Sequence, residues 1–195
     1  MSIIFNEREH AKKVIEKGIQ TPRNKGRELQ LVANYLREQG YNDKQIETEL
    51  HRISKKSFSD YNKVIMYDFI DRRVKRSKKG TLKSNIPVKI TQAEINTILS
   101  EENIKYQKLM FVYLVLAKYY MSNNNSDKYY VGCSDTDLFS LCDMFTSRQE
   151  KREMVHYLTK KGYIEPTTKM SSIVKYVNEN SDIIMEVVPD ETMVY

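Results

Sequence analysis

The sequence predicts a mostly helical α+β protein with one small β-hairpin, divided into an N-terminal helical domain and a mixed C-terminal domain. Three observations predict this. Apolar residues recur at helical spacing through most of the chain. This pattern breaks off at 77–90, where Gly, Ser, Asn and Pro gather. β-Branched residues then fill 171–177 and 182–188, on either side of a polar turn. We therefore expect domains at 1–76 and 91–195, joined by a basic linker at 77–90.

The first domain is predicted to contain four short helices, at 6–17, 26–39, 43–54 and about 60–76. Gly18 and Gly40 follow the first two helices as stop signals. Asn42, with Gln45 three residues later, resembles a capping box that opens the third helix. The two helices around Gly40 also have the outline of a helix-turn-helix pair, although any two helices joined by such a glycine turn share it.

The second domain is predicted to begin with a helix and to end in strands. Thr91 and Glu94 form a capping-box pattern at its start. The helix at 106–122 is apolar on most faces, which is typical of a buried central helix. The remaining elements are a helix at 92–100, a short strand at 129–132, helices at 135–145 and 148–162, a strand at 163–167 and the hairpin of 171–177 with 182–188.

The sequence contains no segment that predicts a membrane protein. Its most apolar stretch, 109–117, lies between Lys108 and Lys118 and is far shorter than the roughly 20 residues that span a bilayer. The first residues also lack the apolar core of a signal peptide. We therefore expect a soluble, cytoplasmic protein with no membrane partner.

The residues that usually carry catalysis or bind metals are few and scattered. His10, His51 and His156 show no metal-ligand spacing, and no glycine-rich phosphate loop or G-x-S-x-G motif is present. Cys133 and Cys142 are nine positions apart, which fits no usual metal site. The sequence therefore predicts a protein that is not an enzyme and that needs no metal and no cofactor.

The positive charge is concentrated in the first half. Residues 1–90 contain 21 Lys and Arg against 11 Asp and Glu, a net charge of +10, whereas residues 91–195 contain 11 against 15, a net charge of −4. The densest run has seven cations in twelve residues: Arg72, Arg73, Lys75, Arg76, Lys78, Lys79 and Lys83. We expect this run to contact a phosphate backbone, and the alternative is a solvated linker.

From 106 to 188 the predicted order is long helix, short strand, two helices, strand and hairpin. The second of the two helices has Leu158 in its last turns and ends at Gly162, which Tyr163 and Ile164 follow. This arrangement resembles the winged helix-turn-helix superfamily, and the chain resembles small DNA-associated proteins of phages or other mobile elements. The resemblance implies a C-terminal winged helix over about 106–188.

The resemblance also implies which residues would contact DNA. In this superfamily the outer face of the helix at 148–162 enters the major groove. Arg148 and Arg152 would then read guanine, Gln149 would read adenine, and Lys175 would reach a groove or the backbone from the wing. The helix at 106–122 is either a homodimer interface or part of the core.

The combined expectation is a non-enzymatic protein that binds duplex DNA in replication initiation or transcription regulation, in the cytoplasm of a bacterial host cell. The net acidic charge of the second domain favours an alternative, because DNA affinity depends on neutralising phosphates. In that alternative the chain is a protein-interaction module that inhibits or adapts a host nucleoprotein machine, and its partner is a host or phage protein.

Overall fold

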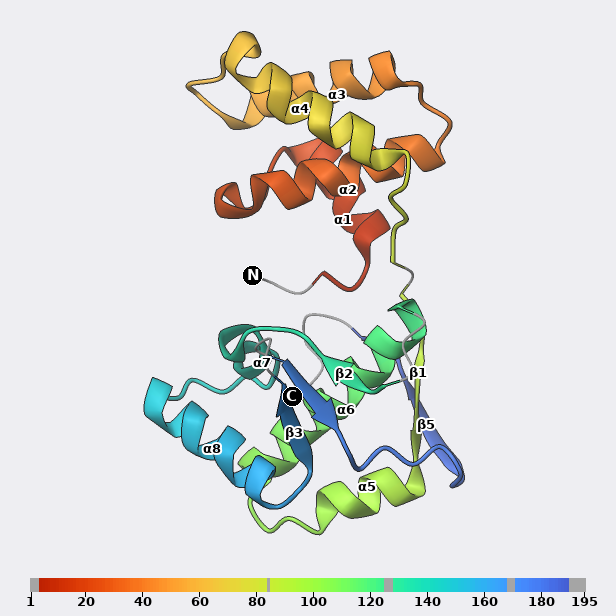
Figure 1. Ribbon diagram of the computed structural model, residues 1–195, viewed down its shortest axis with the longest axis vertical. Helices are drawn as coiled ribbons and strands as arrows, with labels where there is room; N and C mark the ends of the chain where they lie inside the picture. Colours follow the sequence, from red (N-terminus) through yellow and green to blue (C-terminus); the bar gives the residue numbers. More distant parts are fainter. Residues whose placement is uncertain (1–3, 84, 125–127, 168–170, 190–195) are drawn as a thin grey trace. The chain divides into compact units, whose positions relative to one another are not determined.

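The computed structural model describes residues 4–83, 85–124, 128–167 and 171–189 (Figure 1). These residues form eight α-helices and a few antiparallel strands in two small sheets. The chain divides into two compact units: residues 6–84, here called the helical unit, and residues 1–5 with 85–195, here called the mixed unit. The helical unit is therefore inserted into the chain of the mixed unit.

The helical unit consists of α1 Glu7–Lys17, the 3-10 turn η1 Pro22–Asn24, α2 Lys25–Glu38, α3 Asp43–Ser57 and α4 Lys63–Ser77. The side chain of Asn6 caps α1, and Asn42 forms the predicted capping box with Gln45 at the start of α3. The predicted start of the fourth helix at Asp60 is wrong, because Asn62 provides the side-chain oxygen that caps α4.

Helix α2 packs against each of the other three helices of this unit. Its inward residues Leu29, Val32 and Leu36 are buried, as are Ile46 and Leu50 on α3. These residues recur every three or four positions, so each helix presents one apolar face to a shared core.

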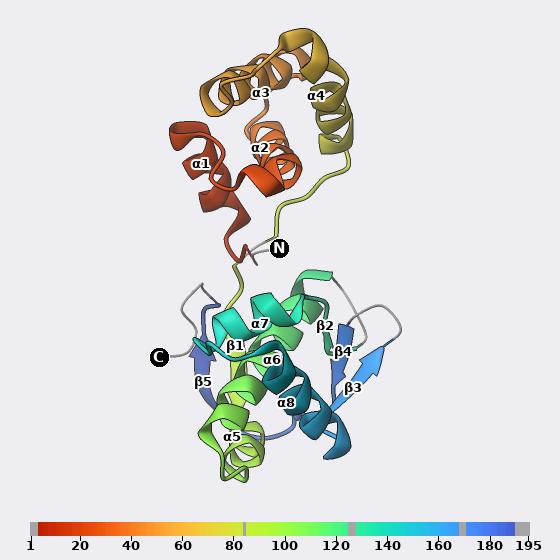
Figure 2. The same ribbon diagram turned by 90° about the vertical axis from the view of Figure 1, so that its left-hand side faces the viewer.

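The mixed unit consists of β1 Val88–Thr91, α5 Gln92–Leu99, α6 Ile104–Asn124, β2 Tyr130–Val131, α7 Asp135–Leu141, α8 Arg148–Lys160, β3 Ile164–Thr167, β4 Ser171–Val174 and β5 Ile183–Val187. The predicted buried helix at 106–122 is confirmed as α6, whose residues from Val112 to Ala117 are all buried. In Figure 2, α6 runs between the two sheets. No helix in the described parts of the chain is long and apolar enough to cross a membrane.

The strands pair differently from the predicted hairpin. β4 pairs antiparallel with β3 on one side and with β2 on the other, so this sheet has the order β2-β4-β3 (Figure 2). β5 instead pairs antiparallel with β1, with Val88 opposite Val187 and Ile90 opposite Met185. The predicted pairing of 171–177 with 182–188 is therefore wrong, and Val88–Ile90, predicted as linker, form part of a strand.

Hydrogen bonds to the start of α5 explain why 178–181 is not a hairpin turn. The hydroxyl of Thr91 donates to the carbonyl of Asn178 at 2.8 Å, and the N–H of Asn178 donates to Glu94 at 2.9 Å. The N–H of Gln92 donates to the carbonyl of Asp182 at 2.8 Å. The segment is thus held on α5, and the chain passes from one sheet to the other instead of folding back on β4.

A buried ion pair joins β1, α5 and α6. The ammonium group of Lys118 lies 2.8 Å from the carboxylate of Glu94 and donates a second hydrogen bond, of 2.7 Å, to the carbonyl of Lys89. Glu94 also accepts the N–H groups of Thr91 and Asn178, each at 2.9 Å. Both charges are enclosed, since the Glu94 side chain is 0% exposed and that of Lys118 is 7% exposed. Every bond compensates for part of the cost of removing these groups from water.

Candidate nucleic-acid interface

Helix α8 is held in place by its cap and its inner face. The side chain of Ser147 accepts the N–H of Glu150 at 3.1 Å, which begins the helix. Met154 and Leu158 are buried, as the helical phase predicts. Gly162 has φ +79°, and the N–H of Tyr163 donates to the carbonyl of Leu158 at 3.0 Å. A glycine is favoured here because this left-handed conformation strains residues with a Cβ. The chain then enters β3.

The outer face of α8 carries the polar residues that its helical phase predicts. Arg148, Gln149, Arg152, His156 and Lys160 are all exposed. Within the described parts of the chain, no carboxylate forms an ion pair with Arg148 or Arg152. The amide of Gln149 donates to Glu153 at 2.9 Å. This face therefore offers two unpaired guanidinium groups within one and a half helical turns.

Acidic residues beside this face are partly neutralised by lysines. Lys105 pairs with Glu150 at 2.7 Å. Lys175, at the end of β4, pairs with Glu165 on β3, and this hydrogen bond lowers the pKa of the Glu165 carboxyl. Lys175 is exposed, but it must leave Glu165 or share it to bind a phosphate.

The basic run is not an extended arm over most of its length. Helix α4 continues to Ser77, so the first four cations, Arg72 to Arg76, lie on its last turns. The guanidinium of Arg73 lies 4.5 Å from the centre of the Phe69 ring, and burial lowers its pKa. Lys75 pairs with Asp71 one turn earlier, at 2.7 Å.

The later part of the run is also engaged within the helical unit. Lys78 pairs with Asp43 at 2.8 Å, and this contact is the largest cause of the lowered pKa of Asp43. The backbone N–H of Lys83 donates to the carboxylate of Glu7 at 2.8 Å. The Lys83 side chain is half-buried, and burial lowers the pKa of its ammonium group. Arg72, Arg76 and Lys79 remain exposed, with the Arg72 side chain bonded to the carbonyl of Asp68. The run therefore offers fewer freely available cations than its composition suggests.

Sequence reasoning missed an exposed aromatic residue next to α8. The predicted helix at 135–145 is wrong at its end, because α7 stops at Leu141 and Asp143 adopts a left-handed φ of 50°. Phe145 consequently lies outside the helix, two residues before the cap of α8, and its side chain is 98% exposed. The sequence shows an aromatic residue close to the start of α8. Its exposure could not be predicted, because it depends on where α7 ends.

The two cysteines are expected to be unreactive in the folded protein. Burial raises the pKa of Cys133 and of Cys142 to about 12 each, so at neutral pH each thiol is almost wholly protonated. Since the thiolate is the nucleophile, iodoacetamide should modify the folded chain at least about a hundredfold more slowly than the urea-denatured chain. Intact-mass measurements over time would check this. Modification of either cysteine at the denatured rate would contradict it.

No group of three or more His, Cys, Asp or Glu side chains that could hold a metal ion is present within the described residues. Comparisons with protein-family models, with curated proteins and with solved structures found no match to this chain.

Proposed function

We propose that this chain is a non-enzymatic protein that binds duplex DNA through a winged helix formed by α6, β2, α7, α8, β3 and β4. The order of these elements along the chain supports the proposal. So does the sheet order β2-β4-β3, in which β3 and β4 are consecutive antiparallel strands that follow α8. In winged-helix proteins that bind DNA, the helix in the position of α8 enters the major groove.

The observation that carries the proposal is the outer face of α8. Arg148 and Arg152 are exposed and unpaired within the described chain, and they lie on the first turns of the helix. The N-terminal residues of such a helix contact base edges, and an Arg can bond to guanine through two N–H groups. Gln149 lies between them and can pair with adenine once its bond to Glu153 is released.

The helical unit would add non-specific affinity. Arg72, Arg76 and Lys79 are exposed, and phosphate contacts of this kind strengthen binding to every sequence. The engagement of Arg73, Lys75 and Lys78 within the unit reduces the number of contacts expected from the run. A role in replication initiation or in transcription regulation is consistent with this division between readout and phosphate binding.

Fluorescence anisotropy with a labelled duplex, from about 50 to 200 mM KCl, tests the proposal. We expect the affinity of the unmodified protein to fall as the salt concentration rises. Replacing Arg148 and Arg152 together with Ala should weaken binding at least about tenfold and flatten the salt slope, because two charge contacts are lost. The matched control is Lys44→Ala with Lys55→Ala, which removes the same charge from exposed positions on α3.

Two outcomes of this experiment would contradict the proposal. Equal losses of DNA affinity in the two double variants would show that binding depends on net charge and would contradict a specific role for α8. Binding that is absent at every salt concentration would reject DNA binding. That result would favour the second candidate, a protein-interaction module acting on a host nucleoprotein machine. The observation behind the second candidate is an apolar surface on α4, where Val64 is 85% exposed and Ile65 is 76% exposed.

A further inference from the structure

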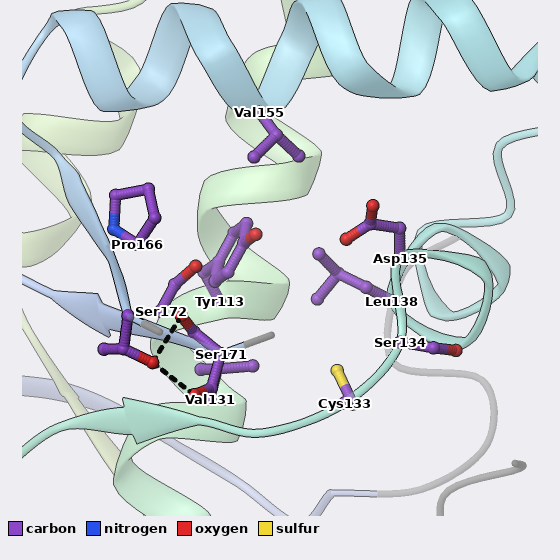
Figure 3. A pocket seen from close by; sticks show the side chains of 11 residues that line it. Tyr113, Val131, Cys133, Ser134, Asp135, Leu138, Val155, Pro166, Ser171 and Ser172 are labelled. Carbon is purple, nitrogen blue, oxygen red and sulfur yellow. Dashed lines mark hydrogen bonds between the residues drawn. The ribbon is translucent and has the colours of Figure 1, made fainter. Parts of the chain in front are cut away.

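The mixed unit contains a half-enclosed cavity of about 260 Å³ (Figure 3). Side chains from α6, α7, α8 and all three strands of the β2-β4-β3 sheet line it. The cavity is smaller than the roughly 300–1,000 Å³ typical of sites for drug-sized ligands. Any organic ligand of this cavity is therefore small, of about the size of one substituted ring.

Most of the cavity wall is apolar. Val131 comes from β2, Leu138 from α7 and Val155 from α8. In Figure 3 the Leu138 side chain points from α7 towards Tyr113, and Val155 points into the same space from α8 above it. Apolar walls that meet from separate elements favour a compact hydrocarbon group over water alone.

The polar groups that line the cavity differ in whether they already have hydrogen-bond or ion-pair partners. Ser171 already exchanges hydrogen bonds with Tyr130 and Thr167, each at 2.5 Å. The phenol of Tyr113 also lies in the cavity wall. Asp135, by contrast, has no ion-pair partner among the described residues.

The charge of the lining therefore discriminates between ligands. Among the described residues that line the cavity, Asp135 alone carries a formal charge, and Figure 3 shows its carboxylate extending from α7 on the side of Tyr113. No Lys or Arg among the described residues lines the cavity beside it. An anion would be repelled here, whereas a cation would gain a charge-assisted hydrogen bond.

We infer that this cavity binds a small organic amine with a compact apolar body. The ammonium group meets Asp135 and the Tyr113 hydroxyl, and the apolar body lies against Val131, Leu138 and Val155. This inference does not depend on DNA binding, because the cavity lies on the inner side of α8 and its test needs no nucleic acid.

Benzylamine is a suitable probe, because it places a single ring one carbon away from an ammonium group. Titration into the isotope-labelled protein, followed by NMR, should shift the signals of Val131, Leu138 and Val155 with a dissociation constant of about a millimolar. Benzyl alcohol should bind at least about tenfold more weakly, because it lacks the charge. Benzoate should produce no saturable shift.

Two substitutions and one control locate the binding. Asp135→Asn should reduce the affinity for benzylamine to that for benzyl alcohol, and Val155→Phe should abolish binding of both by filling the cavity. Asp143→Asn removes the same charge from an exposed residue just after α7 and outside the lining, so it should leave the affinity unchanged within about twofold. The NMR spectrum of each free variant shows whether it is folded.

The inference is overturned if excess benzylamine leaves the cavity signals of the folded protein unchanged. It is equally overturned if benzoate binds as well as benzylamine, or if the folded Asp135→Asn variant keeps full affinity for the amine. A second readout is protection of Cys133, which lines the same cavity. Saturating benzylamine should slow its residual alkylation further, and no change in that rate would count against the site.

Discussion

Replacing Lys118 with Met is expected to destabilise the mixed unit by about 3–5 kcal/mol. The substitution keeps the long apolar stem but removes the ammonium group, so the carboxylate of Glu94 is left enclosed without its counter-charge. The carbonyl of Lys89 also loses a hydrogen bond. Glu94 also accepts the backbone N–H groups of Thr91 and Asn178. We therefore expect the substitution to weaken the contacts between α5 and the segment that connects β4 to β5.

Hydrogen exchange of the α6 amides, read by mass spectrometry, would measure this change within the mixed unit. The matched control is Lys105→Met, which breaks an exposed ion pair with Glu150 and should cost less than about 1 kcal/mol. Combining Lys118→Met with Glu94→Gln should recover part of the loss, because no unpaired charge is then buried. A Lys118→Met variant as stable as the Lys105→Met control would contradict the buried ion pair.

Replacing Phe5 with Ala is expected to cost the mixed unit about 3–5 kcal/mol, although Phe5 lies 80 residues from the rest of that unit in sequence. Its side chain is 3% exposed and packs edge-on against Tyr119, with the ring centres 5.3 Å apart. The hydroxyl of Tyr119 donates to the carbonyl of Phe5 at 2.9 Å, which fixes the backbone as well. The substitution leaves a cavity beside α6.

The same exchange measurement applies, with Phe145→Ala as the matched control. Phe145 is 98% exposed, so its truncation should change stability by no more than about 0.5 kcal/mol. Tyr119→Phe keeps the ring and removes the hydroxyl, and it should cost about 1 kcal/mol. If Phe5→Ala were as mild as Phe145→Ala, the N-terminal residues would not belong to the core of the mixed unit.

The helices of this protein are largely predictable because their signals are local. The capping box of Asn42 with Gln45, the glycine after α8 and the apolar faces of α3 and α8 each involve residues within a few positions of one another. Before α4, both Asp60 and Asn62 could cap the helix. Which of them does so depends on the preceding turn, and the predicted start at Asp60 was wrong.

Strand pairing was less predictable, since it depends on residues far apart in the chain. β1 and β5 are about 95 positions apart, and β1 looks like linker because it is short and follows a proline. The turn at 178–181 resembles a hairpin turn in composition, but its hydrogen bonds run to α5. Composition cannot reveal such a partner.

In the candidate interface, the positions of the α8 residues were predictable, but the interactions of the basic run were not. Helical periodicity was enough to place Arg148, Gln149 and Arg152 on the outer face of α8, because that face follows from the spacing of Met154 and Leu158. The availability of the cations was not predictable. Arg73 stacks on Phe69 on its own helix, whereas Lys78 pairs with Asp43 on α3, and only the packing of α3 against α4 brings the latter pair together.

Most helical segments, their apolar faces and the concentration of positive charge could be predicted from the sequence, because these properties depend on neighbouring residues. Three features follow only from the fold: Phe5 belongs to the mixed unit, β5 pairs with β1, and Asp135 lines the same cavity as Val155. Each of these features requires contact between segments that are far apart in the chain. Such contacts are stabilised by apolar burial and strand pairing, which local sequence patterns do not reveal.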